Sequence, residues 1–285
     1  KNILKKYRLD KSDISAIGYA GITLDHRPDL KKSLYLGNPK ILSSMLSIPV
    51  ISDFRQTDID AGGQGAPLTG LFHKYLNTIM NKSLIYLNLG GFANVSIPNK
   101  AKLMSYDTGP ANYLIDAWCR EKFDIEFDLN GRLASMGEID SEVLKLMLKD
   151  KYFIKKPPKS TGFELFNMSW VKKHLKKTSF SRDINILATL TYLTVITVSN
   201  GINKYRSKSN SIFFYGGGAF NKLIVEGIID LTKLKKVKSL RYGINEKNLE
   251  ATAFAWLALM RINRVKFPKS EITGASKSYY LGNIY

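Results

Sequence analysis

One aspartate is the best candidate for proton chemistry in this sequence. Asp107 stands in the segment Tyr106-Asp107-Thr108-Gly109-Pro110. Pro110 suits the first position of a helix, and Thr108 or Gly109 suits its cap. Asp107 would then lie just before a helix N-terminus, whose dipole favours an ionised carboxylate. Such a group can take a proton from water or a hydroxyl. A capping aspartate explains the same spacing equally well.

Two glycine turns could approach phosphate groups. The first is Leu89-Gly90-Gly91-Phe92-Ala93-Asn94, and the second is Tyr215-Gly216-Gly217-Gly218-Ala219-Phe220-Asn221. Glycine lets backbone N–H groups come close to phosphate oxygens, because no Cβ intervenes. The second turn joins a strand to a helix, whose N-terminus would favour an anion. An ordinary hairpin turn and an ordinary tight turn are the alternatives.

A polar, glycine-rich segment could bind a sugar. Residues 61–67 read Ala-Gly-Gly-Gln-Gly-Ala-Pro and follow a polar stretch that contains Asp53, Arg55, Asp58 and Asp60. Carboxylates and arginine can bind neighbouring hydroxyls in a bidentate way. A solvated loop is the alternative.

Several kinds of site are excluded by residue type and spacing. His26, His73 and His174 are scattered, and Cys119 is the single cysteine, so we expect no zinc site and assign no metal ligands. The sequence also lacks a Gly-x-x-x-x-Gly-Lys-Ser/Thr loop and a Gly-x-Ser-x-Gly turn.

The composition limits the kinds of partner that this chain is expected to bind. The chain has 285 residues, 44% of them hydrophobic, and a formal charge of +19. Its lysines are spread along the chain and lack the aromatic and glycine pattern of an RNA-binding sheet, so we expect a basic surface rather than a nucleic-acid site. The most apolar stretch, 187–198, contains four threonines, and we expect no membrane span. A single cysteine suits the cytoplasm.

Hydrophobic patterns predict alternating strands and helices. Strands are expected at 14–19, 49–53, 84–89, 93–97 and 211–215, with 84–89 and 93–97 forming a hairpin. Helices are expected at 2–8, 39–46, 68–75, 110–118, 142–148, 185–202, 220–228 and 249–261, with a turn at 25–29 and a polar loop at 155–162. The helix at 185–202 is apolar nearly all round and should be central. The alternation indicates an α/β fold with ligands at strand ends.

Taken together, these segments resemble the anhydro-N-acetylmuramic acid kinase family of bacterial cell-wall recycling. The matching segments follow the family's order across essentially the whole chain: 17–18, Gly21, Thr23, 26–28, 36–39, 52–55, 61–67, 87–92, 106–110, 158–162, Glu164, 166–167, Trp170, 216–221, Glu250, 253–258 and 273–275.

The resemblance implies a two-lobed actin-like (ribonuclease-H-like) sugar kinase fold that closes on ATP and sugar. It implies lobes of 1–54 with 269–285 and of 55–268, and a possible homodimer. The implied reaction converts 1,6-anhydro-N-acetylmuramic acid, water and ATP into N-acetylmuramic acid 6-phosphate and ADP, with Mg²⁺.

The resemblance also implies roles for individual residues. Asp107 would be the general base that activates the water. Thr23, Arg55, Gln64 and Glu250 would bind the sugar. Gly90, Gly91 and Asn94 would lie by the phosphates, and Gly216, Gly217 and Gly218 by the adenosine.

The sequence departs from the family pattern at three places. The family's N-terminal Gly-x-Met-Ser-Gly-Thr-Ser-x-Asp-Gly phosphate loop is not found in this sequence, so we expect the first lobe to be incomplete at its N-terminus. The usual His-Gly-Gln-Thr reads Ala20-Gly21-Ile22-Thr23, and the usual arginine after Thr-Gly is Phe163. Two alternatives to a kinase are a non-catalytic sugar- or nucleotide-binding remnant and, from charge alone, a nucleic-acid-binding protein.

Overall fold

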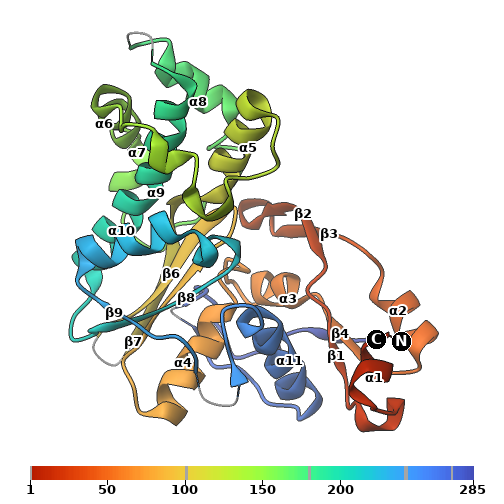
Figure 1. Ribbon diagram of the computed structural model, residues 1–285. Coiled ribbons are helices and arrows are strands. Elements are labelled where there is room, and N and C mark those ends of the chain that lie inside the picture. Colours follow the sequence, from red (N-terminus) through yellow and green to blue (C-terminus); the bar gives the residue numbers. More distant parts are fainter. Residues whose placement is uncertain (1, 100–101, 179–180, 241–242, 271) are drawn as a thin grey trace. The chain divides into compact units, whose positions relative to one another are not determined.

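The computed structural model describes residues 2–99, 102–178, 181–240, 243–270 and 272–285. The chain divides into two compact units, Lys1–Leu76 with Asn248–Tyr285 and Asn77–Lys247. In Figure 1 the first unit runs from red to orange and ends in blue, and the second runs from yellow to cyan. The boundaries between these units, at 76/77 and 247/248, differ from the predicted lobe boundaries at 54/55 and 268/269. The predicted boundaries concern the lobes of a kinase and stay a prediction.

The first unit is built on a small mixed sheet. Strand β4 (Val50–Ser52) pairs in parallel with β1 (Ile17–Gly18) and antiparallel with β10 (Asn283–Ile284). Helix α11 (Leu249–Ile262) packs on all three strands. A Cβ at Gly18 would lie 2.3 Å from the Phe254 carbonyl oxygen, so only glycine permits this approach. The packing of α11 is the reason that this helix belongs to the first unit.

Local capping explains helix α2 (Pro39–Leu46), which the sequence predicted. The Asn38 side chain accepts hydrogen bonds from the backbone N–H groups of Lys40 and Ile41, at 3.0 and 3.3 Å. Pro39 occupies the first helical position, where its missing N–H costs nothing. Further helical segments of this unit are α1 (Asn2–Tyr7), η1 (Lys11–Asp13), α3 (Phe54–Asp60) and the start of α4 (Thr69–Met80).

Two features of this unit were missed in the sequence. Strands β2 (Ile22–Arg27) and β3 (Lys32–Leu36) form a hairpin through η2 (Pro28–Leu30), where only a turn was expected. Most side chains of β2 are exposed, so the strand shows no alternation of buried and exposed positions. Helix α3 was read as a polar stretch because only Phe54, Asp58 and Ile59 are buried in it.

The second unit contains a five-stranded sheet in the order β7-β6-β5-β8-β9. The predicted hairpin is confirmed as β5 (Ile85–Leu89) and β6 (Phe92–Asn99), and β7 (Lys102–Pro110) extends it. Strand β8 (Ser211–Tyr215) pairs with β5 in parallel, and β9 (Lys235–Lys236) follows it in parallel. The predicted α/β class is confirmed.

Helix α9 (Asp183–Tyr205) packs on one face of this sheet, and two further helices share its hydrophobic core (Figure 1). These two are α5 (Asn112–Phe123) and α10 (Lys222–Thr232). The sheet face that points into this core carries Leu87, Val95 and Phe214, which are fully or almost fully buried. The smaller helices are η3 (Leu129–Gly131), η4 (Ala134–Met136), α6 (Ser141–Leu148), α7 (Lys151–Ile154), α8 (Met168–Leu175) and η5 (Gly217–Phe220).

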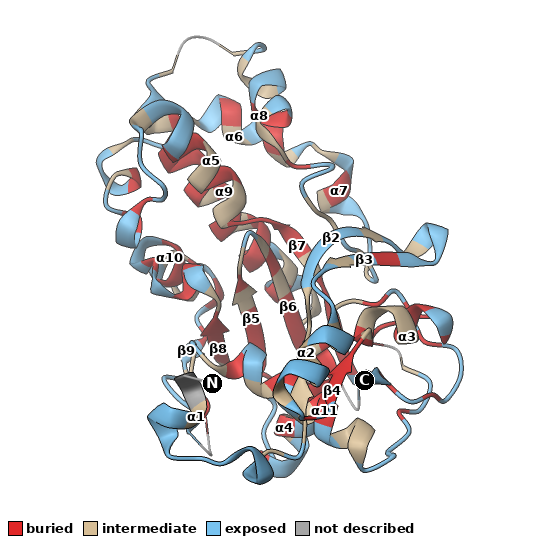
Figure 2. Ribbon diagram, turned by 90° about the vertical axis from the view of Figure 1, so that its right-hand side faces the viewer, coloured by how far each residue is buried: buried red, intermediate tan, exposed pale blue. Residues whose placement is uncertain are grey.

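Helix α9 is the central helix that the sequence predicted. Much of it, with the strands beneath it, is coloured as buried in Figure 2. Its threonines are satisfied within the fold: Thr191 donates to the Leu187 carbonyl at 2.9 Å, and Thr194 donates to the Pro110 carbonyl at 3.1 Å. Among the described residues, α9 is the one helix long and apolar enough to cross a membrane. However, 67% of its most apolar window is buried in the protein, as expected of a core helix.

Candidate active site

Asp107 lies inside a strand, so the prediction that it precedes a helix is wrong. Strand β7 continues to Pro110, which pairs with Phe92 of β6, and α5 begins only at Asn112. Residues up to Pro110 pair with the neighbouring strand, and this pairing prevents the helix from starting there. Helix capping therefore no longer accounts for the carboxylate of Asp107.

Helix α7 and the loop at 155–162 hold Asp107 at the outer edge of β7. The Asp107 N–H donates to the Lys159 carbonyl at 3.1 Å, and the Asp107 carbonyl accepts from the Tyr152 hydroxyl at 2.7 Å. The Thr161 N–H donates to Oδ2 of the Asp107 carboxylate at 3.0 Å. These three contacts fix both the backbone and the direction of a half-buried carboxylate.

A polar row crosses the sheet from Asp107. Asp107 is in register with Asn94 of β6, Asn94 with Asn88 of β5, and Asn88 with Tyr215 of β8. Side chains directly opposite each other share a face. The alternating residues Leu87, Val95 and Tyr106 enter the core under the helices, so the polar row lies on the other face. Asp107, Asn94 and Asn88 are each half-buried.

The first glycine turn is tied to the start of α5. The Gly90 carbonyl accepts from the Asn112 N–H at 3.1 Å. The Gly91 carbonyl accepts from the N–H groups of Ala111 and Tyr113, at 2.9 and 3.0 Å. Gly91 is exposed, and a Cβ there would meet only the Tyr113 Cβ, at 3.5 Å. This turn therefore presents its backbone at the end of β5.

The second glycine turn packs against the first. A Cβ at Gly216, whose φ is +83°, would lie 2.4 Å from Oδ1 of Asn88, and one at Gly218 would lie 2.8 Å from the Leu89 Cβ. These two glycines are thus required by the packing of the strand ends. Gly217 is exposed, and its Cβ would come no nearer than 3.7 Å to a described neighbour. Of the three, Gly217 is the one that packing does not explain.

The predicted helix after this turn begins later than expected. Residues Gly217–Phe220 form the 3-10 turn η5, and α10 starts at Lys222 with Asn221 as its cap. The Asn221 side chain accepts from the Ile224 N–H at 3.3 Å. The N-terminus of α10 is therefore already capped by a side chain.

In the first unit, three of the predicted sugar-binding residues lie on neighbouring elements. The Arg55 guanidinium donates to the Gly65 carbonyl at 2.9 Å, and the backbone N–H of the exposed Gln64 donates to the Thr273 carbonyl at 2.6 Å. A Cβ at Gly65 would lie 3.0 Å from Cε1 of His26, which is on β2 with the exposed Thr23. Arg55 is thereby connected to β2 and to the segment 61–67.

His26 was part of the family motif without a predicted role. Its Nδ1 lies 3.2 Å from the Ser33 hydroxyl. Burial, reinforced by the charge of Arg55, lowers the pKa of His26 below its usual value. Both effects favour the neutral form of the imidazole beside the guanidinium.

Glu250 lies on another element of the same unit. It is exposed in the first turn of α11, the helix that packs on β1, β4 and β10. Its role in sugar binding stays a prediction, as do those of Thr23, Arg55 and Gln64.

Asp58 anchors the glycine-rich segment and is not free to bind a sugar. It is fully buried, and its Oδ2 accepts from the Gly65 N–H at 2.7 Å. Its Oδ1 accepts from the Thr273 hydroxyl at 2.7 Å and from the Tyr279 hydroxyl. Burial and the Asp58 charge raise the pKa of Tyr279, so this phenol remains a donor. Asp58 therefore shapes the loop in which Gln64 stands.

Three residues of the site had no predicted role: Tyr152 and Thr161, which contact Asp107, and Asn88, which lies two strands away in the polar row. Thr161 offers a buried hydroxyl for which the described part of the chain provides no hydrogen-bond partner. The motif 158–162 was a signal in the sequence, but nothing in it indicated a backbone contact to Asp107. Asn88 is marked by its position just before the first glycine turn.

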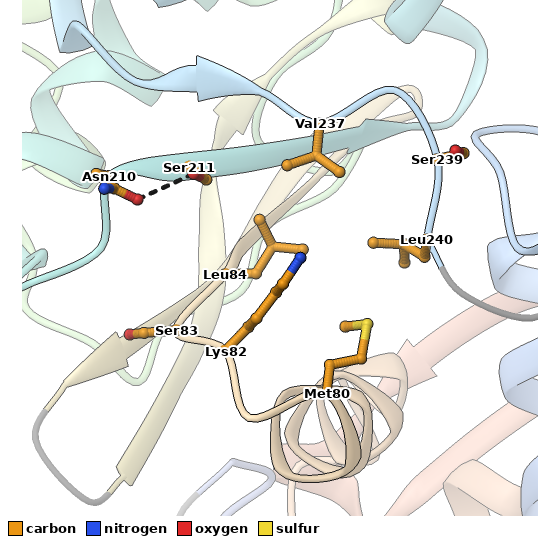
Figure 3. Close-up of a pocket in the computed structure, with 9 residues that line it drawn as sticks. All are labelled: Met80, Lys82, Ser83, Leu84, Asn210, Ser211, Val237, Ser239 and Leu240. Carbon is orange, nitrogen blue, oxygen red and sulfur yellow. Dashed lines mark hydrogen bonds between the residues drawn. The ribbon is translucent and has the colours of Figure 1, made fainter.

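A separate hollow of about 430 Å³ lies at the opposite ends of β5 and β8 (Figure 3). The side chains of Met80, Lys82 and Leu84 line one side of the hollow, and those of Val237 and Leu240 line the opposite side. It adjoins Ser211, the first residue of β8, whereas the glycine turns follow the last residues of β5 and β8. This hollow is therefore distinct from the candidate active site.

A carboxylate and two exposed glycine turns at one end of an α/β sheet are the elements of a nucleotide-dependent phosphotransferase. The chain belongs to the anhydro-N-acetylmuramic acid kinase family, whose sequence model matches residues 1–285. It is 37% identical over 287 residues to the anhydro-N-acetylmuramic acid kinase of Pseudomonas syringae pv. syringae (strain B728a), covering 100% of this chain and 79% of the relative. It is 37% identical over 290 residues to that of Coxiella burnetii (strain Dugway 5J108-111), covering 99% and 77%. These relatives support the kinase and not the non-catalytic alternative.

Two solved structures are also similar to this chain. One is an activator of the 2-hydroxyisocaproyl-CoA dehydratase from Clostridium difficile with bound ADPNP, with a TM-score of 0.42, 13% identity, and coverage of 75% of this chain and 68% of that one. The other is xylulose kinase from Rhodospirillum rubrum, with a TM-score of 0.42, 11% identity, and coverage of 67% and 41%.

Proposed function

We propose that this protein opens 1,6-anhydro-N-acetylmuramic acid with water and phosphorylates the freed 6-oxygen with ATP, giving N-acetylmuramic acid 6-phosphate and ADP. The observation that carries the proposal is the Asp107 carboxylate, oriented by the Thr161 N–H in a polar row that leads to both glycine turns. Family membership supplies the substrate.

Asp107 serves as the general base in this proposal. The water oxygen forms a bond to C1 of the sugar, and its proton passes to the carboxylate. The C1–O6 bond breaks, and O6 takes the γ-phosphoryl group as ADP leaves. A positioned base of this kind contributes roughly 10²–10⁴-fold to a rate.

The phosphates of ATP would lie against the backbone of Gly91 and Gly217, the two turn glycines that are exposed. This assignment of Gly217 differs from the family resemblance, which places it by the adenosine. Backbone N–H groups at such turns supply fixed dipoles for a developing charge, which is the main contribution a protein makes to phosphoryl transfer. Asn94, in register with Asp107, would donate or accept a hydrogen bond on the phosphate side. Gly216 and Gly218 would hold the turn beside the adenosine.

The sugar would be bound by residues of the first unit. Arg55, Thr23 and Gln64 lie on α3, β2 and the segment 61–67, and Glu250 lies on α11. Arginine suits a carboxylate such as the lactyl group of the sugar, because its fork matches two oxygens.

Mg²⁺ is part of the proposal as the partner of ATP. Among the described residues there is no group of three or more His, Cys, Asp or Glu side chains that could hold a metal. In nucleotide sites Mg²⁺ is bound by substrate phosphates, water and one or two protein oxygens, so such a cluster is not required. Asn88 and Asn94 are the residues of the polar row whose amide oxygens could add a ligand. The ion would neutralise charge on the phosphates.

The biological setting is also proposed. The reaction belongs to the recycling of cell-wall sugars in the cytoplasm. The partners would be ATP, the amino sugar and a second copy of the chain, with no nucleic acid or membrane.

The test compares wild type with Asp107→Asn in the presence of ATP, Mg²⁺ and anhydro-N-acetylmuramic acid. We expect kcat for ADP release to fall by roughly 10²–10⁴-fold. In wild type, turnover in ¹⁸O-labelled water should place the label on C1 of the product. Asp230→Asn, an exposed aspartate on α10, is the matched control and should retain wild-type activity. Equal activity of Asp107→Asn and Asp230→Asn would reject Asp107 as the base.

A further inference from the structure

A pocket of about 330 Å³ lies behind β7, on the side of the sheet covered by α9. Its lining includes Tyr106 of β7, Lys204 and Tyr205 at the end of α9, and Lys155 and Lys159 of the loop 155–162. We call it the β7 pocket. Asp107 belongs to the opposite face of the same strand, so the β7 pocket is not the site proposed for ATP and sugar.

The β7 pocket is strongly cationic. Three lysines line it, and none of the described residues that line it is acidic. Burial and the neighbouring charges of Lys204 and Lys155 lower the pKa of Lys159 to about 8, against the opposing effect of Asp107. The lysines therefore repel one another at short range, and a bound anion would relieve that repulsion.

Two tyrosine hydroxyls in the pocket are left without partners. The hydroxyls of Tyr106 and Tyr205 are buried, and no hydrogen-bond partner for either occurs in the described chain. The Tyr106 hydroxyl would lie 2.8 Å from a Cβ at Gly201, so the glycine in α9 makes room for it. A buried hydroxyl without a partner is costly, and a ligand oxygen would satisfy it.

The chemistry favours a phosphate monoester on a small polar body. A dianion matches several lysines better than a single carboxylate does, because each ammonium adds a charge-assisted hydrogen bond. The rings of Tyr106 and Tyr205 meet edge to face, with centroids 5.7 Å apart, and both residues line the pocket. Their hydroxyls can pair with the hydroxyls of a sugar. The volume is at the lower end of small-molecule sites.

We propose that the β7 pocket is a second binding site, for a phosphorylated sugar whose phosphate is held by Lys155, Lys159 and Lys204 and whose hydroxyls pair with the phenols of Tyr106 and Tyr205. A ligand in this pocket would influence the position of Asp107, because the carbonyl of Lys159 accepts a hydrogen bond from the Asp107 N–H at 3.1 Å. The binding claim is independent of the proposed reaction.

The experiment titrates the full chain with N-acetylglucosamine 6-phosphate and, separately, with inorganic phosphate, by calorimetry at constant ionic strength. We expect saturable binding of one sugar phosphate per chain, and weaker binding of inorganic phosphate. Lys204→Gln should raise the Kd for the sugar phosphate about tenfold or more, since it removes a hydrogen bond to a charged group. Tyr205→Phe should also weaken binding.

The matched control is Lys208→Gln, which removes the same charge from an exposed position that does not line the pocket. It should change the Kd by less than about twofold, in line with the small effect of a distant surface charge. Equal effects of Lys204→Gln and Lys208→Gln would overturn the proposal, as would the absence of saturable binding. Equal affinity for inorganic phosphate would refute recognition of a sugar. Weakening by Gly217→Ala but not by Lys204→Gln would place the ligand in the catalytic site instead.

Discussion

The Thr161 N–H donates to the Asp107 carboxylate at 3.0 Å, across 54 residues of sequence. Together with the Tyr152 hydroxyl on the Asp107 carbonyl, this contact makes α7 and the loop at 155–162 the support of the proposed base. Neither residue needs to touch substrate to influence the reaction. Their effect would come through the direction of the carboxylate.

The first prediction tests this support with Tyr152→Phe. The change removes the hydroxyl that donates to Asp107 at 2.7 Å and leaves the buried ring in place. We expect the free energy of unfolding to fall by about 1 kcal/mol, the usual net value of a hydrogen bond. The kcat should fall several-fold with little change in KM, because a small misplacement of a catalytic group acts on the chemical step. Tyr280→Phe, at a position that is 39% exposed, is the control. A fall in stability with unchanged kcat would show that Tyr152 is structural only.

The second prediction separates two adjacent glycines. Gly218→Ala should destabilise the fold by about 1–3 kcal/mol, because its Cβ would lie 2.8 Å from the Leu89 Cβ and 3.0 Å from the Asn112 side chain. Gly217→Ala has room for its Cβ and should unfold like wild type. It should nevertheless raise the KM for ATP, because the new methyl group stands where phosphate would approach. Urea unfolding and initial rates measure both effects. An unchanged KM in Gly217→Ala would remove this turn from the nucleotide site.

The third prediction concerns pH and His73 in α4, which is 1% exposed. Burial lowers the pKa of His73 to about 3, against about 6.5 in an unfolded chain. Below pH 6.5 the unfolded chain binds a proton that the folded chain does not, so stability falls as the pH falls. Between pH 6.5 and 5 this histidine should cost about 2 kcal/mol of unfolding free energy.

His73→Leu should flatten this part of the stability profile, and Tyr75→Phe, a change in the same helix without a group that titrates near pH 6, should not. Urea unfolding at several pH values gives the comparison. Parallel profiles for wild type and His73→Leu would contradict the assignment.

The fourth prediction concerns the ammonium of Lys159. It packs 4.4 Å from the ring centre of Tyr152 and donates to the Tyr152 carbonyl at 3.0 Å. With its pKa lowered to about 8, the group should titrate at a clearly lower pH than an ordinary lysine, whose pKa is about 10.5. Carbon-13 NMR of labelled lysine, assigned with Lys159→Arg, would give the midpoint. Saturation with N-acetylglucosamine 6-phosphate should raise it, because an anion favours the protonated form. A midpoint near 10.5 would contradict the described burial of this side chain.

Hydrophobic runs and helix-capping residues in the sequence were a good guide to several elements. The hairpin of β5 and β6, the central helix α9 and the capped helix α2 were all predicted. Where the pattern was weak, the prediction failed. The exposed side chains of β2 show no period of two, and α3 has few buried positions in a polar stretch. The local sequence of β2 does not reveal that it is a strand, because β2 forms by pairing with β3.

In the candidate active site, too, the sequence predicted some features correctly and others wrongly. Asp107 was identified from its motif, but its helix-cap context was wrong, because β6 pairs with β7 as far as Pro110. Asp58 was grouped with sugar-binding carboxylates, although Thr273 and Tyr279, more than 200 residues away, use its oxygens. Such contacts depend on chain segments whose proximity no local spacing reveals.

By itself, the sequence determined the α/β class, the family and the residue types available for phosphoryl transfer, because periodicity and ordered motifs are local properties of the chain. Tertiary structure alone decided which of those residues remain available. It placed Asp107 in register with Asn94 and Asn88, showed that Gly216 and Gly218 are required by packing while Gly217 stays open, and gathered three lysines behind β7. The physical reason is that burial, register and mutual charge arise only when distant segments pack together.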